Sequence, residues 1–418
     1  MDKRYFCIDM KCFYASVECA ERRLDPFETD LVVADVERGK NALCLAISPH
    51  MKALGVKNRC RLSEIPKSIK YIIAKPRMKK YVDYAADIYD VYLDYVSGDD
   101  IHVYSIDESF IDASPYLARY RTDAHGFARL LINKVAERLR IPSTAGIGTN
   151  LYLAKIALDI TAKHAPCHIG YLDEESYKKT IWDHRPITDL WQISVGTAAR
   201  LGHYGIYDMR GVANAPEELL YKAFGINAEL LIDHAWGREP CTIADIKSYK
   251  PSSRSVSSSQ ILFEDYSYEK ALLVMREMAL GGAQELMRRK VIASSVGIGV
   301  SYSGGNPPSS GASMAFSQPT SLYSVIRPAV DELFARTTHR GVPIRRLAIS
   351  FGSVMDEGCE GYDLFTDREA MERERLLEHT VLGIKDKFGK NAVLRGFDLE
   401  EGATAMIRNK LIGGHNGE

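Results

Sequence analysis

Three acidic residues at the ends of predicted strands are the clearest sign of chemistry in this chain of 418 residues. Asp9 closes a short apolar run, and Asp107 and Glu108 lie between two strand-like runs, residues 101–106 and 109–113. Carboxylates that converge repel one another unless a cation neutralises them, and Mg²⁺ prefers such hard oxygen ligands. Two magnesium ions held there could activate an attacking hydroxyl and neutralise a leaving pyrophosphate. The simpler alternative is that all three are ordinary acids in turns.

The elements that must position these acids alternate between strands and helices. Period-two or continuous apolar runs predict strands at residues 5–10, 30–34, 42–47, 101–106, 109–113 and 144–148, and helical spacing predicts helices at residues 13–18, 81–95, 126–139 and 151–162. The turn after residue 106 would carry Asp107 and Glu108. This interleaved order is typical of a ferredoxin-like sheet.

After residue 171 the predicted elements are no longer strands that alternate with long helices. Short helices broken by glycine run to about residue 238, and a Ser-rich stretch that reads as a linker follows. A second strand-and-helix domain comes next, with strands predicted at residues 256–262, 296–300 and 344–351 and helices at residues 269–290 and 322–336. Residues 369–388 predict an acidic amphipathic helix. The length alone favours several domains.

Charge is balanced overall but uneven along the chain. The net charge is −1, yet residues 57–80 contain nine Lys or Arg and a single acid, and residues 320–350 contain five Arg and two acids. Residues 356–386 reverse this balance, with ten acids and four bases. One basic stretch is usually a solvated face, but two of them favour a groove for a polyanion.

Cysteine spacing and hydropathy argue against four classes: zinc-binding, disulfide-stabilised, secreted and membrane-spanning proteins. Eight cysteines occur without a C-x-x-C pair, which predicts buried free thiols instead of zinc ligands or disulfides. We find no signal peptide and no run long enough to span a membrane, so we expect no membrane partner and a cytoplasmic protein.

Several motifs occur in the order and spacing of a known family. They are DMKCFYASVE at residues 9–18, SIDES at residues 105–109, GIG at residues 146–148 and KIA at residues 155–157. On these residues the chain resembles the Y-family translesion DNA polymerases over essentially its whole length. The resemblance is closest to the UmuC-like branch, which includes the catalytic subunit of bacterial DNA polymerase V.

The resemblance implies an α+β right-hand polymerase with a ferredoxin-like palm, small fingers, a helical thumb and an α+β little finger. We assign the palm to residues 1–12 and 79–170, the fingers to 13–78, the thumb with a helix-hairpin-helix to 171–238, the linker to 239–253, the little finger to 254–354 and an acidic C-terminal tail to 355–418. The expected function is template-directed addition of deoxynucleotides to a primer 3′-hydroxyl opposite damaged template, in the SOS response to DNA damage.

Catalytic roles are carried over from the family one residue at a time. Asp9, Asp107 and Glu108 would be the catalytic metal ligands for two Mg²⁺ ions, and Met10 would add its backbone carbonyl. Tyr14 matches the steric gate, the ring that would collide with a ribose 2′-hydroxyl. A packed helix aromatic is the alternative for Tyr14.

Two lysines and a phenylalanine complete the nucleotide contacts that the resemblance implies. Phe13 would contact the nucleotide next to the gate, while Lys52 and Lys163 would neutralise triphosphate charge. The alternative for each lysine is a solvated surface position. The chain departs from the family nearby, because Pro49 stands where many relatives carry tyrosine and Lys11 where many carry aspartate.

Contacts to DNA and to a partner are also implied. The family's thumb turn would be Ser194, Gly196 and Thr197, although Ser194 replaces a common glycine, and an ordinary helical hairpin is the alternative. Template phosphates would meet Arg254, Ser255 and Ser257 at the start of the little finger, where a flexible linker is the alternative. A peptide resembling a sliding-clamp motif contains Tyr362, Leu364 and Phe365, without the usual leading glutamine.

The expected partners are therefore primer-template DNA, deoxynucleoside triphosphates, a sliding clamp and possible accessory subunits. A nucleotidyl cyclase would use similar paired carboxylates without needing basic DNA-binding domains. A DNA-bound scaffold that has lost catalysis is a second alternative, which the intact acids at 9, 107 and 108 disfavour.

Overall fold

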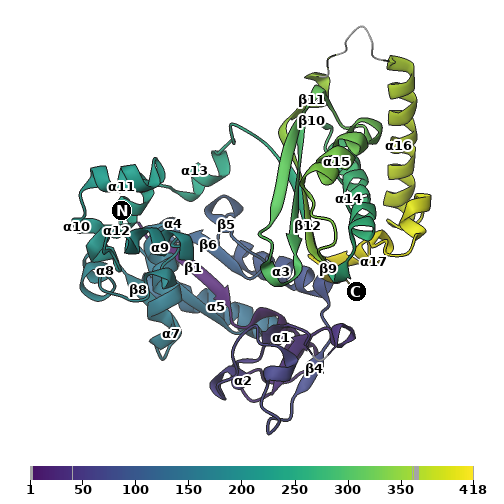
Figure 1. Cartoon of the computed structure of the whole chain (residues 1–418). Helices are drawn as coiled ribbons and strands as arrows, with labels where there is room; N and C mark the ends of the chain where they lie inside the picture. Colours follow the sequence, from purple (N-terminus) through teal and green to yellow (C-terminus); the bar gives the residue numbers. More distant parts are fainter. Residues whose placement is uncertain (1–2, 40, 360, 362–366, 418) are drawn as a thin grey trace. The chain divides into compact units, whose positions relative to one another are not determined.

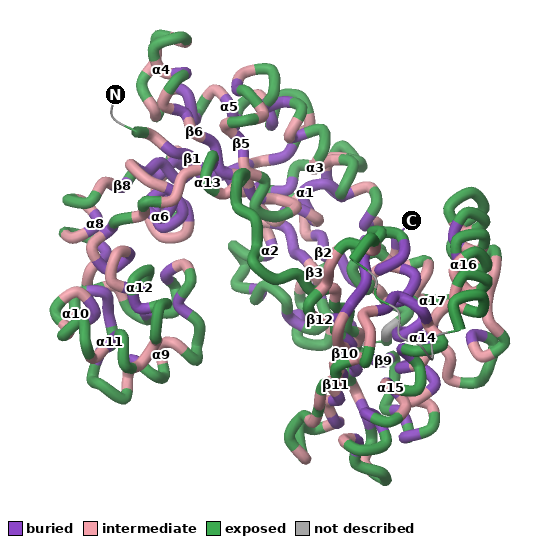
Figure 2. The backbone as a smooth tube through the Cα atoms, turned by 90° about the horizontal axis from the view of Figure 1, so that it is seen from above, coloured by how far each residue is buried: buried purple, intermediate pink, exposed green. Residues whose placement is uncertain are grey.

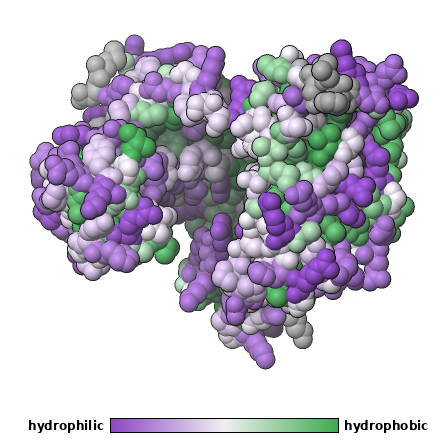
Figure 3. Space-filling view, turned by 45° about the horizontal axis from the view of Figure 1, so that its top comes forward, coloured by the Kyte–Doolittle hydropathy of each residue, from purple (hydrophilic) through white to green (hydrophobic). Residues whose placement is uncertain are grey.

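The structure is a computed structural model that describes residues 3–39, 41–359, 361 and 367–417. It divides into two compact units, Met1–Tyr249 with His415–Glu418 and Lys250–Gly414. Both units mix sheets with helices, so the predicted α+β class is confirmed (Figure 1). Within the described residues, no helix has the length and apolar character needed to cross a bilayer. Hydrophilic residues cover most of the face in Figure 3, with hydrophobic residues in scattered groups.

A five-stranded sheet forms the centre of the first unit. Its strands lie in the order β5 (Ile101–Val103), β6 (Glu108–Asp112), β1 (Tyr5–Met10), β7 (Ser143–Gly148) and β8 (Ile169–Leu172). β1 pairs antiparallel with β6 and with β7, and only the β7–β8 pair is parallel. β1 is therefore central, and residues far apart in sequence become its neighbours.

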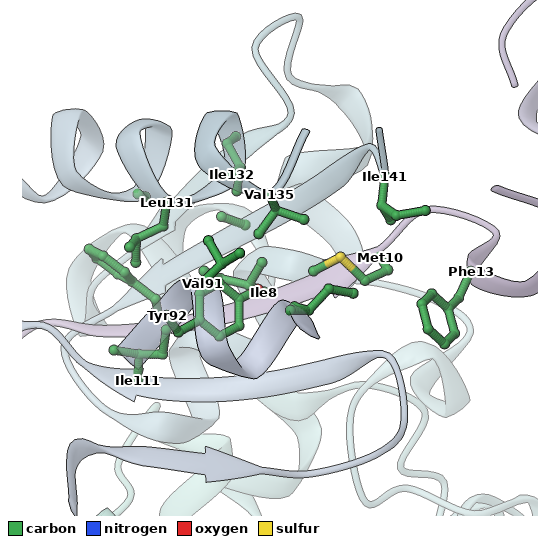
Figure 4. Packing of buried hydrophobic residues seen from close by; sticks show 14 of the residues in the cluster. Ile8, Met10, Phe13, Val91, Tyr92, Ile111, Leu131, Ile132, Val135 and Ile141 are labelled. Atoms are coloured by element: carbon green, nitrogen blue, oxygen red, sulfur yellow. The ribbon is translucent and has the colours of Figure 1, made fainter. Parts of the chain in front are cut away.

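Alternate residues of β1 face two different helical layers, as the pleat of a strand requires. Ile8 and Met10 pack against α3 (Met78–Leu93) and α5 (Ala124–Leu139), and Figure 4 shows them beside Val91, Leu131 and Val135. The odd-numbered residues face α6 (Leu151–Ile156) instead. Asp9 is odd-numbered and so belongs to the α6 face.

The predicted helix at residues 151–162 is confirmed, but part of it has a different pitch. α6 continues into a π-helical segment, η4 (Ala157–Thr161), and then into α7 (Ala162–His164). π-helical turns are rare and often occur at functional sites. This one lies directly after Lys155.

A small three-stranded sheet forms a separate lobe within the first unit. Its strands lie in the order β3 (Cys44–Ile47), β2 (Leu31–Ala34) and β4 (Ile72–Ala74), next to α1 (Phe13–Glu21) and α2 (Pro49–Ala53). Two 3₁₀ turns, η1 (Val36–Arg38) and η2 (Leu62–Glu64), connect these elements. The lobe has a compact core of its own.

Short helices form the rest of the first unit, and those between residues 171 and 238 were predicted. They are α4 (Ser114–Tyr120), α8 (Glu174–Thr180), α9 (Val195–Gly202), α10 (Met209–Asn214), α11 (Glu217–Phe224), α12 (Asn227–Ala235) and α13 (Ile243–Ser248), with 3₁₀ turns η3 (Gly98–Asp100) and η5 (Ile187–Asp189). The helix α13 corrects our expectation of an irregular linker there. Thr242 and Asp245 form a reciprocal capping box that starts α13, and Ile243 is buried with Tyr5 and Phe110.

The second unit is a four-stranded antiparallel sheet with two helices on one face. The strands lie in the order β11 (Ser310–Thr320), β10 (Val291–Tyr302), β12 (Ile344–Asp356) and β9 (Val256–Tyr266), and the helices are α14 (Tyr268–Arg288) and α15 (Tyr323–Thr337). The sequence reading missed β11. Its small and polar residues lack the β-branched run that announces a strand.

The C-terminal segment belongs to the second unit up to residue 414. Its elements there are α16 (Arg368–Phe388), η8 (Gly396–Leu399), α17 (Ala405–Arg408) and the short strand β13 (Leu411–Ile412), whereas β14 (His415–Asn416) belongs to the first unit. The 3₁₀ turns η6 (Ser303–Gly305) and η7 (Glu357–Cys359) lie earlier in the second unit. The predicted helix at residues 369–388 is confirmed. Figure 2 shows that most of α16 is exposed, and Glu378 and Leu382 are its buried residues.

Candidate active site

The acids Asp9 and Glu108 lie directly opposite each other on neighbouring strands. Asp9 is the partner of Glu108 in the β1–β6 ladder, and both side chains lie on the face that α6 covers. Cross-strand partners of this kind have Cβ atoms about 5 Å apart. The strand register therefore brings together two residues separated by almost a hundred positions.

Asp107 lies next to this pair, in the turn that precedes β6. The Met10 amide donates a hydrogen bond to the Asp107 carbonyl oxygen at 2.9 Å, which ties the end of β1 to the turn. The hydroxyl of Ser105 donates to Asp107 Oδ1 at 2.7 Å. Asp107 is thus in the turn as predicted, whereas Glu108 is already the first residue of β6.

The electrostatics of Asp9 show that negative charge accumulates here. Burial, followed by the neighbouring charges of Asp107 and Glu108, raises the pKa of Asp9 from 3.8 to about 7. Like charges brought together in a poorly solvated place oppose ionisation. The charge of Lys155 lowers the pKa of Asp9, but it offsets these effects only in part.

Glu108, by contrast, already has partners. Its Oε2 accepts a hydrogen bond from Lys155 Nζ at 2.8 Å, and its Oε1 accepts one from the Cys7 thiol at 3.0 Å. Lys155 also pairs with Asp159 at 3.2 Å. Burial alone would lower the pKa of Lys155, but its anionic surroundings raise it, so the ammonium group stays charged.

Glycines let the helix that carries Lys155 approach the sheet. A Cβ atom on Gly146 would lie 2.1 Å from the Ala154 carbonyl oxygen, and one on Gly148 would lie 2.1 Å from the Ala154 amide. Any side chain at either position would collide with backbone. These two β7 residues therefore set the distance at which Lys155 reaches Glu108.

The donor set suits a hard cation, although its present arrangement is not that of a metal site. Within the described residues, no group of three or more His, Cys, Asp or Glu side chains is arranged to hold a metal ion. Both oxygens of Glu108 bond protein groups instead, Lys155 and Cys7. Carboxylate oxygens remain the ligands that Mg²⁺ prefers, and the raised pKa of Asp9 is the signature of uncompensated charge.

Phe13 and Tyr14 open α1, two residues after the end of β1. Phe13 is 3 % exposed and belongs to the core of the five-stranded sheet. Tyr14 is half-buried, and burial and the charge of Asp107 raise the pKa of its hydroxyl. Tyr14 is therefore close to the acids, whereas Phe13 supports the local packing.

The predicted phosphate-binding lysines occupy different surroundings. Lys52 is exposed on α2 and lies beside Lys11 and Cys12, where it raises the local positive potential. Lys11 Nζ contacts His168 Nδ1 at 3.0 Å. Lys163 is exposed on α7, just beyond the π-helical segment. Sequence reasoning singled out Lys52 and Lys163 but gave Lys11 no role.

The predicted thumb residues form the N-terminus of α9. Ser194 is the N-cap, and its hydroxyl accepts a hydrogen bond from the Thr197 amide at 3.0 Å. A Cβ on Gly196 would meet only the Ser194 hydroxyl, at 3.7 Å, so the turn is open. This is an exposed, capped helix start.

The remaining predicted residues belong to the second unit. Arg254 and Ser255 are exposed just before β9, and the Arg254 carbonyl accepts a hydrogen bond from the Val354 amide at 3.0 Å. Ser257 is exposed on β9 and pairs with Ser350 in the ladder. The predicted clamp-binding residues Tyr362, Leu364 and Phe365 lie outside the described residues.

Sequence reasoning quoted Lys155 in a family motif but gave it no role at the site, and it gave Cys7 no role beyond that of a free thiol. One signal was available: Lys155 is a single cation inside an otherwise apolar helical run, and such a residue is usually buried with an acid. Its acid could not be named from the sequence. Tyr81, which stacks on Tyr14, and Glu18, which binds the Tyr81 hydroxyl, were also given no role.

Comparisons with known proteins agree on the family. Residues 8–159 match the model of the impB/mucB/samB family, and residues 253–364 match the model of its C-terminal domain. The chain is 30% identical over 420 residues to the putative UV-damage repair protein UvrX of Bacillus subtilis, covering 99% of this chain and 97% of the relative. It is 29% identical to DNA polymerase IV 2 of the same organism, covering 99% of both.

A solved structure agrees in fold. A Y-family DNA polymerase chimera superposes with a TM-score of 0.65 at 18% identity, covering 84% of this chain and 99% of the chimera. Together, the two family models, the full-length relatives and this fold lead to one conclusion: the chain belongs to the impB/mucB/samB family and is a Y-family translesion DNA polymerase.

Proposed function

We propose that Asp9, Asp107 and Glu108, with the carbonyl of Met10, hold two Mg²⁺ ions at which this polymerase extends a primer. The observation that carries the proposal is the cross-strand pairing of Asp9 with Glu108 beside Asp107. The raised pKa of Asp9, caused by burial and these neighbours, supports it. Magnesium bound there would lower the pKa of the primer hydroxyl and neutralise charge on the leaving pyrophosphate.

The protein's own contribution is to hold its carboxylates on rigid strands. Lys155 orients Glu108 and compensates its charge, and Cys7 fixes the other Glu108 oxygen. We infer that Lys155 and Asp159 remain paired when a cation draws Glu108 away, because their link is independent of Glu108. The buried ammonium would then keep a partner.

Nucleotide selection is assigned to the start of α1 and to nearby lysines. Tyr14 would present its ring to the sugar and exclude a 2′-hydroxyl, and Phe13 would support that turn. Lys52 and Lys163 would neutralise triphosphate charge. The exposed positions of both lysines are compatible with these roles.

We further propose that two surfaces contact DNA without reading its sequence. Ser194, Gly196 and Thr197 would offer backbone amides of α9 to one phosphate, while Arg254, Ser255 and Ser257 would track the template strand. In the second unit, the sheet face opposite α14 and α15 carries small residues in register, including Gly297 and Ser350, alongside Ser257. A face of small residues allows close approach of a sugar-phosphate backbone.

Partners beyond DNA and nucleotides remain proposals from the sequence. Tyr362, Leu364 and Phe365 would bind a sliding clamp, and accessory subunits could join the complex. Because the substrate is DNA, we place the enzyme with the chromosome, which in a bacterial cell is the cytoplasm. The family assignment removes the cyclase and scaffold alternatives, since neither is a DNA polymerase.

Primer extension with and without Mg²⁺ tests the metal assignment. Asp107→Ala should abolish extension while leaving primer-template affinity near that of the native protein. Asp99→Ala, an exposed acid on the preceding turn, is the matched control and should extend normally. Extension by the Asp107 variant at the native rate would refute the assignment.

A further inference from the structure

The ring of Tyr14 lies flat against a second tyrosine. The centroids of Tyr14 and Tyr81 are 4.4 Å apart, and the ring planes differ by 16°. Tyr14 is half-buried near the start of α1, whereas Tyr81 is fully buried in the first turns of α3. The Tyr14 ring therefore packs against the buried ring of Tyr81.

Tyr81 is itself fixed by a buried acid. Its hydroxyl donates a hydrogen bond to Glu18 Oε1 at 2.9 Å, and Glu18 is 0 % exposed. The guanidinium of Arg77 binds the same carboxylate with two nitrogens, Nε at 3.0 Å and Nη2 at 2.9 Å, and Arg22 also pairs with it. Two-point arginine–carboxylate bonds of this kind hold both groups in a defined geometry.

Helical spacing explains how the four groups meet. Tyr14 and Glu18 are four residues apart on α1, and Arg77 and Tyr81 are four residues apart at the start of α3. Residues at that spacing share one face of a helix. Each helix therefore presents one aromatic ring and one charged group to the other.

If these residues served only to stabilise the fold, the ion pair between Arg77 and Glu18 would be sufficient. The additional hydrogen bond from Tyr81 to Glu18 would not be required. Burying a carboxylate such as Glu18 is costly, and its ion pair with a partly exposed arginine is often no more stabilising than a well-packed apolar pair. What the paired carboxylate does provide is a fixed orientation for the Tyr81 hydroxyl, and so for the ring against Tyr14. The hydrogen bonds of Glu18 therefore position Tyr81, which stacks on Tyr14, the residue proposed to select the sugar.

We propose that Tyr81, anchored by Glu18, is a positioning residue that holds the Tyr14 ring in place and sets how strictly the enzyme rejects ribonucleotides. This inference rests on the proposed role of Tyr14. Without the Tyr81 ring, Tyr14 can tilt into the space left behind, and a 2′-hydroxyl then fits beside it. Deoxynucleotide addition needs no such constraint and is little affected.

The test compares kcat/KM for a ribonucleotide and for the matching deoxynucleotide in steady-state primer extension. A stacked aromatic pair contributes enough that Tyr81→Leu should shift the ratio toward the ribonucleotide by about two- to twelve-fold. Tyr81→Phe keeps the stacked ring and should give a ratio nearer the native one. If the Leu variant is insoluble, Tyr81→Met replaces it, because an unbranched side chain fills the gap more easily.

A matched control separates positioning from general destabilisation. Phe127 is also fully buried in the same core and stacks on Tyr120, at 5.1 Å and 20°, but it does not contact Tyr14. Phe127→Leu should lower thermal stability as much as Tyr81→Leu while leaving the sugar ratio unchanged. A loss of stability alone therefore cannot produce the expected result.

The outcomes distinguish this inference from the function on which it rests. Tyr14→Ala should admit ribonucleotides; if it does not, Tyr14 is not the gate, and both the assignment and the inference fail. If Tyr14→Ala admits ribonucleotides and a folded Tyr81→Leu or Tyr81→Met keeps the native ratio, the gate stands and the positioning role is overturned. A relaxed ratio in the Tyr81 variant with a native ratio in Phe127→Leu supports it.

Discussion

Replacing Asp9 by asparagine should stabilise the metal-free protein at alkaline pH, although it removes a proposed metal ligand. Burial and the charges of Asp107 and Glu108 raise the pKa of Asp9 from 3.8 to about 7. The folded protein therefore resists ionising this acid, whereas the unfolded chain ionises it freely. Asparagine has nearly the same shape and no charge, so it avoids the repulsion.

The direction and size of the change in stability follow from the difference between the folded-state and unfolded-state pKa values of Asp9. Because the folded-state pKa is higher than the unfolded one, stability is greatest below pH 3.8 and is lost as pH rises toward 7. The full difference corresponds to an upper bound of about 4 kcal/mol above pH 7, and about 3 kcal/mol of it falls between pH 5 and pH 8. Asp9→Asn should not show this loss.

The assay is urea unfolding at pH 5 and pH 8 in the presence of a chelator. The free energy of unfolding of the native protein should fall more steeply between these pH values than that of Asp9→Asn. Asp90→Asn, an exposed acid on α3, should follow the native protein. Adding Mg²⁺ at pH 8 should stabilise the native protein more than the variant. Parallel pH dependences for native protein and Asp9→Asn would refute the reasoning.

Four further substitutions test packing, two of them beside the proposed site and two in the second unit. Lys155→Met leaves the Glu108 carboxylate buried without its cation and should reduce the free energy of unfolding by about 3 to 5 kcal/mol, measured with urea. Gly146→Ala forces a Cβ against the backbone of α6 and should lower the melting temperature sharply, whereas Gly281→Ala, with open space in the middle of α14, should raise stability by about 0.5 to 1 kcal/mol. Glu277→Gln weakens a buried carboxylate that accepts the amides at the start of α17, so hydrogen exchange of the C-terminal segment should accelerate while exchange in β1 is unchanged.

Four strands of the first sheet could be predicted because apolar residues mark β1, β5, β6 and the end of β7, whereas β8 was not predicted. The placement of Asp9 and Asp107 at strand ends followed from the same runs, and the family motifs supplied the pairing. The register itself could not be derived, since a shift of one residue would have sent Asp9 to the opposite face. The ladder that pairs Asp9 with Glu108 is information that only the structure provides.

The features that escaped prediction depend on contacts distant in sequence. The partner of Lys155 is decided by how closely α6 approaches β7, which in turn depends on glycines whose role is visible only in three dimensions. Helix α13 was not predicted because it adjoins a polar, Ser-rich stretch and has a single buried residue, Ile243, that packs it against the first unit. Strand β11 was missed because its ladder with β10, and not its own composition, makes it a strand.

The two parts of the proposed site follow opposite electrostatic principles. Behind Tyr14 the buried charge is matched: the carboxylate of Glu18 binds arginines and the Tyr81 hydroxyl, so the Tyr81 ring is held without any ligand. Around Asp9 the charges are unbalanced, and burial makes that imbalance costly. The ring that we propose selects the sugar is therefore held by the fold before substrate arrives, whereas the acids favour whatever brings positive charge. A polymerase assembled this way should keep the Tyr14–Tyr81 stack in the absence of divalent cations and change mainly at Asp9 and Glu108 when cations bind.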